Sequence, residues 1–238
     1  MKLESVNVTK KFLNKTAVDS LSMTLEPGHI YALLGPNGSG KTTWMKMVAG
    51  LIKPSSGDIL FDGRPVDIES RKTIAYMSTE PYFYDWMTVK SVGEYYEDFF
   101  MDFSMDKYYF FIEKMGLAPN LKVKTLSSGM MAKLKIAVTM GRNASVYMLD
   151  EPLNGIDLIA RDEVMKMVLT SAAPDNIMIV SSHLVEELES VVDKAIFIKD
   201  SRFAGLYDLE SLRVNEGLSI ADKYREVFGG IVKEAAHV

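Results

Sequence analysis

The sequence predicts an α/β fold in which helices cover both faces of a mostly parallel sheet. Several short segments of the 238-residue chain are continuously apolar, as strands buried on both faces are. Helical patterns separate these segments, which is typical of a parallel sheet. A glycine-rich phosphate-binding pattern, Gly35 to Thr43, follows one apolar segment and opens one helix. Ligands should therefore gather at the carboxyl ends of the strands.

Two segments near the N-terminus instead alternate apolar and polar residues. Leu3 to Val8 has this period, and Val18 to Leu25 repeats it before the turn Glu26-Pro27-Gly28. Alternation is typical of strands that expose one face. We therefore expect an antiparallel β edge beside the parallel core.

The phosphate-binding pattern lies between a strand, Ile30 to Leu34, and a helix expected over Lys41 to Leu51. Glycines let successive N–H groups point at a phosphate, and the helix N-terminus adds roughly half a positive charge. Lys41 should reach the β- and γ-phosphates, Thr42 should offer its hydroxyl to Mg²⁺, and Thr43 should help hold the α-phosphate side. An ordinary glycine turn is the competing interpretation. The expected loop comprises Gly35, Pro36, Asn37, Gly38, Ser39, Gly40, Lys41, Thr42 and Thr43.

The middle of the chain changes in character. Residues 81–120 are rich in aromatic side chains and carboxylates, with helical spacing in Val89 to Phe100 and in Lys107 to Met115. We predict that 81–120 form a helical subdomain. It would be inserted into a single domain whose core and β edge comprise residues 1–80 and 121–238.

The remaining elements follow from the same patterns. Strands are expected over Asp58–Phe61, Thr73–Met77, Val146–Leu149, Ile177–Val180, Ala195–Ile198 and Phe203–Tyr207. Helices are expected from near Gly129 to Met140 and over Leu184 to Val192. Helical spacing also continues beyond the last strand, so the tail Ser201 to Val238 would cap the sheet or touch a neighbour.

Composition excludes several classes of function. Hydrophobic residues make up 47% and charged residues 25% of the chain, as in a globular protein with a large core. The net charge is −5, which argues against nucleic acid as the main partner. The absence of cysteine rules out disulfides and thiolate chemistry. No apolar run reaches the roughly 18 residues of a membrane span.

Two carboxylates follow the strand Val146 to Leu149. Asp150 closes that buried strand, where a carboxylate needs a cation or hydrogen-bond donors, and Mg²⁺ held mostly through water suits it. Glu151 comes next and can point at a γ-phosphate, so we assign it as the general base for an attacking water. Capping of a loop or helix is the alternative for Glu151.

Taken in order, the motifs resemble those of the ATP-binding subunits of ABC transporters over nearly the whole chain. Gly35 to Thr43 matches the Walker A loop of that family, and Val146 to Glu151 matches Walker B with its catalytic glutamate. Leu126 to Met130 resembles the signature motif, Asn154 to Asp157 resembles the D-loop, and His183 matches the switch histidine. The resemblance implies a P-loop NTPase fold that binds ATP with Mg²⁺.

The resemblance also implies roles for single residues. His183 would hydrogen-bond the γ-phosphate and act in catalysis with Glu151 and Lys41. A satisfied interior or capping histidine is the alternative. Phe12 falls where the family places an aromatic ring against adenine, with a core phenylalanine as the competing interpretation.

The signature segment suggests a second anion site. Ser127, Ser128 and Gly129 stand at the start of a helix, where a hydroxyl and free N–H groups face outward. In the family, two chains bind head to tail, so that each ATP lies between one Walker A loop and the other chain's signature. Asp157 of the D-loop would belong to the same composite site. Plain capping of the helix by Ser127 or Ser128 is the alternative.

The chain departs from the family pattern at three places. Thr79, followed by Glu80, stands where the family has a glutamine that links Mg²⁺ to the helical subdomain. Thr79 would bind Mg²⁺ through water, or Glu80 would substitute. Ser128 replaces a glycine and Met130 replaces a glutamine of the signature, so we predict a functional but slower or looser site.

The segment Pro81 to Trp86 is aromatic and follows directly. In the family this region faces the membrane subunit, and exposed aromatic side chains are good anchors for a partner helix. Packing within the helical subdomain is the alternative. The whole pattern implies an ATP-hydrolysing motor subunit that works on the cytoplasmic side of the cell membrane. It would bind a separate transmembrane permease chain and an identical or different second nucleotide-binding subunit.

The separate chain, the short helical insert and the absence of a C-terminal regulatory domain favour an exporter. Two rival functions stay open. One is a non-transport ATPase of the same superfamily, in DNA repair or at the ribosome. The other is a weakly hydrolysing regulatory subunit.

Overall fold

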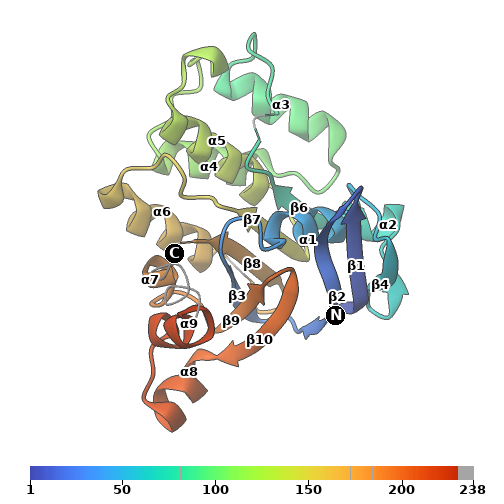
Figure 1. The fold of residues 1–238 in the computed structure, drawn as a ribbon. Coiled ribbons are helices and arrows are strands. Elements are labelled where there is room, and N and C mark those ends of the chain that lie inside the picture. Colours follow the sequence, from blue (N-terminus) through green and yellow to red (C-terminus); the bar gives the residue numbers. More distant parts are fainter. Residues whose placement is uncertain (81, 172, 184, 230–238) are drawn as a thin grey trace.

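The computed structural model describes residues 1–80, 82–171, 173–183 and 185–229 (Figure 1). Its strands form one sheet of six strands and one of four. In Figure 1 the larger sheet crosses the middle of the molecule, the smaller sheet lies beside it, and a group of helices stands at one end. The predicted α/β architecture is confirmed.

The six-stranded sheet has the order β10-β9-β3-β8-β7-β6. Every neighbouring pair is parallel except β10 and β9. The parallel strands therefore end at one edge, where the chemically distinctive segments follow them. The strands are β3 (His29–Leu34), β6 (Ile74–Met77), β7 (Val146–Asp150), β8 (Ile177–Ser182), β9 (Lys194–Lys199) and β10 (Arg202–Asp208).

The two faces of this sheet are buried in two different apolar clusters. Ala32 and Leu34 of β3 pack into one cluster, whereas Tyr31 and Leu33 pack into the other, together with helix α1 (Lys41–Val48). All four side chains are almost fully buried. This double burial explains why the strand has no polar alternation.

The four-stranded sheet is antiparallel and has the order β2-β1-β4-β5. Its strands are β1 (Leu3–Phe12), β2 (Lys15–Leu25), β4 (Ser56–Phe61) and β5 (Arg64–Pro65). The predicted antiparallel edge is confirmed, but its first strand runs past Val8 to Phe12, with shifts of register on the way. That extension places Phe12 at the end of a strand.

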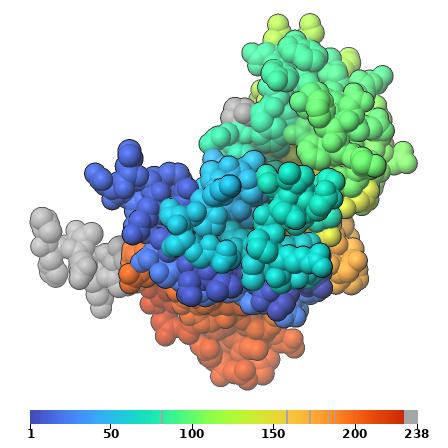
Figure 2. All heavy atoms as spheres, turned by 90° about the vertical axis from the view of Figure 1, so that its right-hand side faces the viewer, coloured from blue at the N-terminus to red at the C-terminus, as the bar shows by residue number. Residues whose placement is uncertain are grey.

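Three longer helices form the group at one end of the molecule: α3 (Val89–Phe99), α4 (Met105–Lys114) and α5 (Ser128–Met140). Thr88 starts α3 in a capping box with Ser91. Figure 2 shows this part, in green, projecting beyond the sheets. Because α5 packs on α3 and α4 and also on β6 and β7, the subdomain boundary at residue 120 stays a prediction.

The C-terminal part covers the sheet. Rings of Tyr224 and Phe228 on α9 (Ile220–Phe228) lie 5.8 and 5.7 Å from the ring of Phe197 in β9. Within the tail Ser201 to Val238, residues 201–229 thus include a cap on the sheet, as one of the two interpretations predicted, and residues 230–238 lie outside the described ranges. The other short elements of the chain are α2 (Ile68–Lys72), η1 (Val123–Thr125), α7 (Val185–Leu188), α8 (Leu209–Ser211) and η2 (Leu212–Glu216).

The helices differ from the sequence prediction at three points. Helix α1 ends at Val48 and not at Leu51, because Gly50 turns the chain with a φ of +66°. The helix expected to end at Val192 ends at Leu188, and its expected first residue, Leu184, lies outside the described residues. Helix α6 (Leu158–Thr170) was not predicted. No helix within the described ranges is both long and apolar enough to cross a bilayer.

Candidate functional site

The phosphate-binding loop joins β3 to α1 and lines a cavity of about 320 Å³. Gly40 has a φ of +109°, and a Cβ there would lie 2.3 Å from the carbonyl oxygen of Ala17. Only glycine fits this position. The cavity is lined by Phe12, Lys15, Ala17, Asn37, Gly38, Ser39, Gly40, Lys41, Thr42, Thr43 and Glu151.

Lys41 and Ser39 give the loop its polar character. The Nζ atom of Lys41 donates to the carbonyl oxygens of Gly35, at 2.6 Å, and Pro36, at 3.3 Å. Burial lowers the pKa of Lys41, while the charges of Glu151 and Asp150 oppose this shift. The buried hydroxyl of Ser39 has no hydrogen-bond partner among the residues that the structure describes, so a phosphate oxygen would satisfy it. The loop therefore fits an anionic group.

Asp150 lies fully buried at the end of β7. Its Oδ1 atom accepts a hydrogen bond from the Ser181 hydroxyl at 2.6 Å, and its Oδ2 atom accepts one from the Tyr76 hydroxyl at 3.3 Å. Burial first, and the charge of Asp150 second, raise the pKa of Tyr76. Both donors stand on neighbouring strands, β8 and β6, and fix the carboxylate in place.

Glu151 reaches the cavity from an unusual backbone conformation. Its φ is +50°, which is uncommon for a residue other than glycine. Residues in such backbone conformations are often found at functional sites. Its N–H donates to the Ser181 hydroxyl at 2.9 Å, and its Oε2 atom lies 2.8 Å from Nδ1 of His183. The structure thus brings the predicted base, the predicted switch histidine and the phosphate loop together.

The fit of this edge to a cation can be judged from its oxygen atoms. Among the described residues, no group of three or more His, Cys, Asp or Glu side chains could hold a metal. Thr42 and Asp150 offer a hydroxyl and a carboxylate, which suits Mg²⁺ because this ion retains water and takes substrate phosphates as ligands. Thr79 is exposed and is not among the residues that line the cavity.

The signature segment lies away from this chain's own cavity. The Ser127 hydroxyl accepts from the N–H of Met130 at 3.2 Å and caps α5. A Cβ on Gly129 would lie 2.6 Å from the carbonyl oxygen of Gly155, so the signature and the D-loop touch. Asp157 caps α6 by accepting from the N–H of Ala160. Ser127 therefore caps its helix, as the alternative interpretation predicted. Asp157 also caps a helix.

Phe12 lies at the rim of the cavity and not in the core. The residue is 47% exposed, and the Nζ atom of Lys10 lies 5.0 Å from the centre of its ring. A partly exposed ring beside the phosphate loop can stack on a flat ligand. Lys15 opposes Phe12 across the hairpin and also lines the cavity. Sequence reasoning did not identify Lys15.

The aromatic segment after β6 reaches the surface. The rings of Tyr84 and Trp86 stack with their centres 5.9 Å apart and their planes 13° apart, and Trp86 is 70% exposed. Tyr82 contributes to a cavity of about 240 Å³ between the sheet and the helices, together with Leu51 and Tyr96. Pro81, the first residue of the predicted segment, lies outside the described residues.

Sequence reasoning missed three residues that hold the site together. Ser181 and Tyr76 donate to Asp150, and Lys135 binds the loop that contains Thr79. Ser181 stands at the carboxyl end of a predicted parallel strand, which is the one signal that could have identified it. Lys135 carries no signal in the sequence, because its partner lies 56 residues away.

Comparisons with known proteins agree on one family. A family model described as "ABC transporter" matches residues 18–154. The chain is 31% identical over 223 residues to the uncharacterized ABC transporter ATP-binding protein YhcH of Bacillus subtilis, covering 90% of this chain and 72% of YhcH. It is 30% identical to the lantibiotic transport ATP-binding protein SrtF of Streptococcus pyogenes over 222 residues, covering 90% of this chain and 96% of SrtF.

A solved structure described as the ATP-binding subunit of an ABC transporter has a similar fold. Its TM-score is 0.83 at 22% identity, with 95% of this chain and 99% of the other covered. A dimeric bacterial ABC transporter cassette has a TM-score of 0.78 at 19% identity, covering 87% of this chain and 98% of the cassette. At these low identities the two structures show that the chain shares their fold.

Proposed function

Because this chain belongs to the ABC transporter family as an ATP-binding subunit, we propose that it hydrolyses ATP to drive a separate transmembrane chain. One observation carries the proposal: Glu151 lines the same cavity as the phosphate loop and bonds to His183. A carboxylate so placed can take a proton from water that attacks a γ-phosphate bound at Lys41. The reaction class is phosphoryl transfer to water.

Each group around the cavity has a distinct task in this proposal. Lys41 turns from the carbonyl oxygens of its own loop to the β- and γ-phosphates, and the loop N–H groups and the Ser39 hydroxyl hold the remaining phosphate oxygens. Phe12 stacks on adenine. His183 contacts the γ-phosphate and, through its bond to Glu151, responds to its loss.

The residues for the cation are Thr42 and Asp150. Together they would hold Mg²⁺ beside a bound ATP, and the ion would supply positive charge that offsets the charge of the phosphates. Asp150 keeps its orientation because Ser181 and Tyr76 donate to it from two neighbouring strands. Thr79 or Glu80 would reach this ion only after a movement of the loop that follows β6.

The signature residues act on a second copy of the fold. Ser127, Ser128 and Gly129 open α5 outside their own chain's cavity, so their free N–H groups can meet the γ-phosphate held by a partner chain. Asp157 would join the same interface. ATP binding then closes the dimer, and hydrolysis opens it. The partner is an identical or a different nucleotide-binding subunit.

The membrane partner would dock at the junction of sheet and helices. The exposed Tyr84–Trp86 stack lies close in sequence to Tyr82, which lines the cavity there with Leu51 and Tyr96. An apolar hollow beside exposed aromatic rings suits a short helix of a permease. The chain would work on the cytoplasmic side of the membrane. Its similarity to SrtF and to the SkfA peptide export ATP-binding protein SkfE of Bacillus subtilis, at 31% identity, supports export.

Two measurements test this function together. Purification of the chain from detergent-treated membranes should recover an integral membrane protein, and the recovery should fall when Trp86 and Tyr84 are changed to Ala. The purified chain should hydrolyse ATP with Mg²⁺, and Lys41→Ala should abolish tight ATP binding. Recovery with ribosomes or DNA in place of a membrane protein would support the non-transport rival. ATP binding without turnover would support a regulatory subunit.

A further inference from the structure

Two lysines from different parts of the fold hold the segment Ser78 to Glu80. The segment follows β6 and leads toward the exposed aromatic rings at Tyr84 and Trp86. Neither lysine belongs to the catalytic groups described above. The segment therefore has fixed attachments on both sides.

Lys135, from the middle of α5, makes the first attachment. Its Nζ atom donates to the carbonyl oxygen of Thr79 at 2.6 Å and to that of Ser78 at 3.1 Å. The same atom lies 5.5 Å from the centre of the Tyr82 ring. Lys135 is only 5% exposed, and burial lowers its pKa. Burying an amine costs free energy unless such partners satisfy it, so this lysine is held in one geometry.

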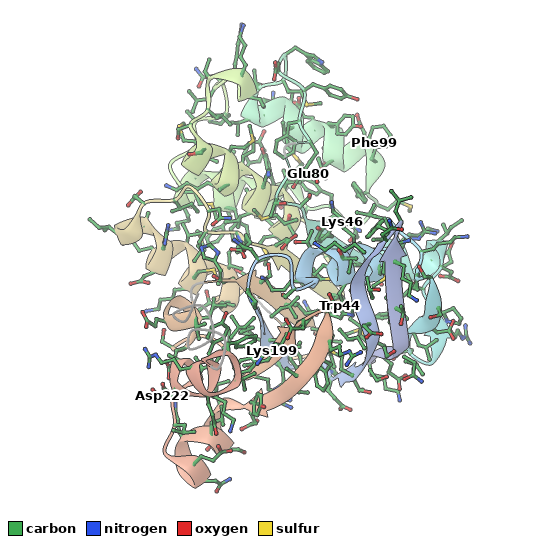
Figure 3. The ribbon with its side chains drawn as sticks, in the orientation of Figure 1. Trp44, Lys46, Glu80, Phe99, Lys199 and Asp222 are labelled. Carbon is green, nitrogen blue, oxygen red and sulfur yellow. The ribbon has the colours of Figure 1, made fainter. Side chains whose placement is uncertain are left out.

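Lys46, on α1, makes the second attachment. Its Nζ atom lies 3.1 Å from Oε1 of Glu80. Figure 3 shows both side chains at the junction between the sheets and the group of helices. The pair is partly exposed, so it contributes little to stability. It can still set the position of the loop relative to α1, whose first residue is Lys41.

The two attachments connect the helix that follows the phosphate loop with the helix that begins at the signature segment. Helix α1 begins at the phosphate loop, whereas α5 begins at the signature residues Ser128 and Gly129. Because a helix is stiff over one or two turns, a displacement of Lys135 moves the start of α5 with it. A shift of α1 would therefore reach the start of α5 through Glu80 and Lys135.

We propose that Lys135 is a positioning residue that transmits the state of the phosphate loop to the signature helix, with the Lys46–Glu80 pair as its counterpart on α1. In this linkage the backbone carbonyl oxygens of Ser78 and Thr79 accept hydrogen bonds from Lys135, so the side chain of Thr79 need not reach the cation. The inference rests on the proposed function, because it concerns how ATP binding and the signature are coupled.

Hydrogen exchange of the full-length chain tests the linkage. Amide exchange in 126–134 is measured with and without a saturating non-hydrolysable ATP analogue and Mg²⁺. In the wild type the analogue should slow exchange at the start of α5. In Lys135→Met the analogue should still bind, with its Kd changed by less than about twofold, but the slowing should be lost. The kcat should fall about ten- to a hundredfold while KM stays close to the wild-type value.

Lys133→Met is the matched control. Lys133 lies on the same helix, and its Nζ atom also donates to a carbonyl oxygen, that of Met115, but this contact stays within the helical group. Lys133→Met should keep both the slowing and kcat, and Lys135→Arg should restore part of what Lys135→Met loses. If Lys135→Met shows the wild-type slowing and kcat, the inference is wrong. A wild type that does not bind the analogue rejects the proposed function instead, and the inference with it.

If Lys135→Met does not fold, the Lys46–Glu80 pair provides a second test of the linkage. Glu80→Lys should weaken the slowing, and the charge exchange Lys46→Glu with Glu80→Lys should restore it. Both positions are accessible to solvent, so neither change disturbs the core. Unaltered slowing in Glu80→Lys would refute the linkage through α1.

Discussion

His183 and Glu151 form a direct pair, with Nδ1 of the imidazole 2.8 Å from Oε2 of the carboxylate. Glu151 is largely buried in this pair, since only 13% of its side chain is exposed, whereas His183 is 44% exposed. The histidine therefore lies on the solvent side, and the glutamate lies toward the phosphate loop. Of the two side chains, Glu151 is the one that lines the cavity of the phosphate loop, so a water beside a phosphate there would face the carboxylate.

Glu151→Gln should lose nearly all turnover while still binding ATP. The amide keeps the shape of the side chain but cannot accept a proton from water, so kcat should fall about 10²–10⁴-fold. Without hydrolysis, ATP should hold two chains together, and size-exclusion chromatography should show an ATP-dependent dimer. Glu163→Gln, at an exposed position of α6, is the control and should behave as the wild type. Unchanged turnover in Glu151→Gln would reject its role as base.

Phe12→Ala should weaken ATP binding without abolishing hydrolysis at saturation. Stacking of an aromatic ring on a base contributes about 1–3 kcal/mol, so KM should rise about 5- to 150-fold while kcat changes little. Phe12→Tyr should keep the affinity. Because an aromatic ring can stack on any base, the KM for GTP should rise as much as the KM for ATP. Leu13→Ala, at the fully exposed neighbour, is the control. An unchanged KM in Phe12→Ala would mean that the ring packs only against Lys10.

Ser181→Ala should separate the support of Asp150 from general stability. The change removes the donor to Asp150 and the acceptor of the Glu151 N–H, which should cost about 1–3 kcal/mol of the free energy of unfolding. It should also raise the Mg²⁺ concentration needed for half-maximal hydrolysis. Ser5→Ala is the matched control, because this buried serine accepts a hydrogen bond from Trp44 and neither residue lines the cavity. An equal shift of the Mg²⁺ requirement in both variants would contradict the assignment.

The free energy of unfolding should fall steeply above about pH 10. Burial raises the pKa of Tyr76, Tyr96 and Tyr108 in the folded chain, so the unfolded chain loses these protons first, near its ordinary value of about 10. The folded state then binds more protons than the unfolded state, and stability decreases with rising pH. Lys41 and Lys135, whose pKa values burial lowers, act in the opposite direction but only up to about pH 10.5.

Urea unfolding at several pH values measures this slope. Tyr108→Phe is the informative variant, because Tyr108 is fully buried and its hydroxyl donates to the carbonyl oxygen of Val89 at 2.5 Å. The variant should lose about 1 kcal/mol at neutral pH and show a shallower decrease above pH 10. A parallel decrease in both proteins would contradict the role of Tyr108.

The sequence predicts the parallel sheet and its reactive edge because those features are local. Apolar runs such as Val146 to Leu149 stop where Asp150 and Glu151 begin, and the order of the motifs along the chain indicates the family. Contacts between distant residues are not visible in this way. Lys135 lies far along the chain from Thr79, and Ser181 from Asp150, so their roles emerge only when the sheet and helices pack.

The missed helix α6 has a different explanation. The family pattern identifies Asp157 as a D-loop residue, but the same side chain also caps this helix. Val164, Met165 and Val168 supply the buried face of the helix. The D-loop assignment of Asp157 therefore gave no indication that this residue also starts a helix. Thr79 is a position that the family pattern singles out, and its side chain is exposed in this chain, so its role toward Mg²⁺ stays a prediction.

Ser128→Gly should speed hydrolysis if the signature meets a partner's γ-phosphate. The Ser128 hydroxyl and Cβ lie 3.0 Å from the point where a Cβ on Gly155 would stand, so this side chain fills space where the signature and D-loop touch. Its removal lets the N–H groups of α5 approach an anion more closely, and kcat/KM should rise by up to about tenfold, equivalent to about 1.4 kcal/mol. Gly129→Ala should have the opposite effect, because its Cβ would lie 2.6 Å from the Gly155 carbonyl oxygen. Steady-state hydrolysis over a range of protein concentrations measures both. If neither variant changes kcat/KM, the signature does not contact the nucleotide and the head-to-tail dimer is wrong.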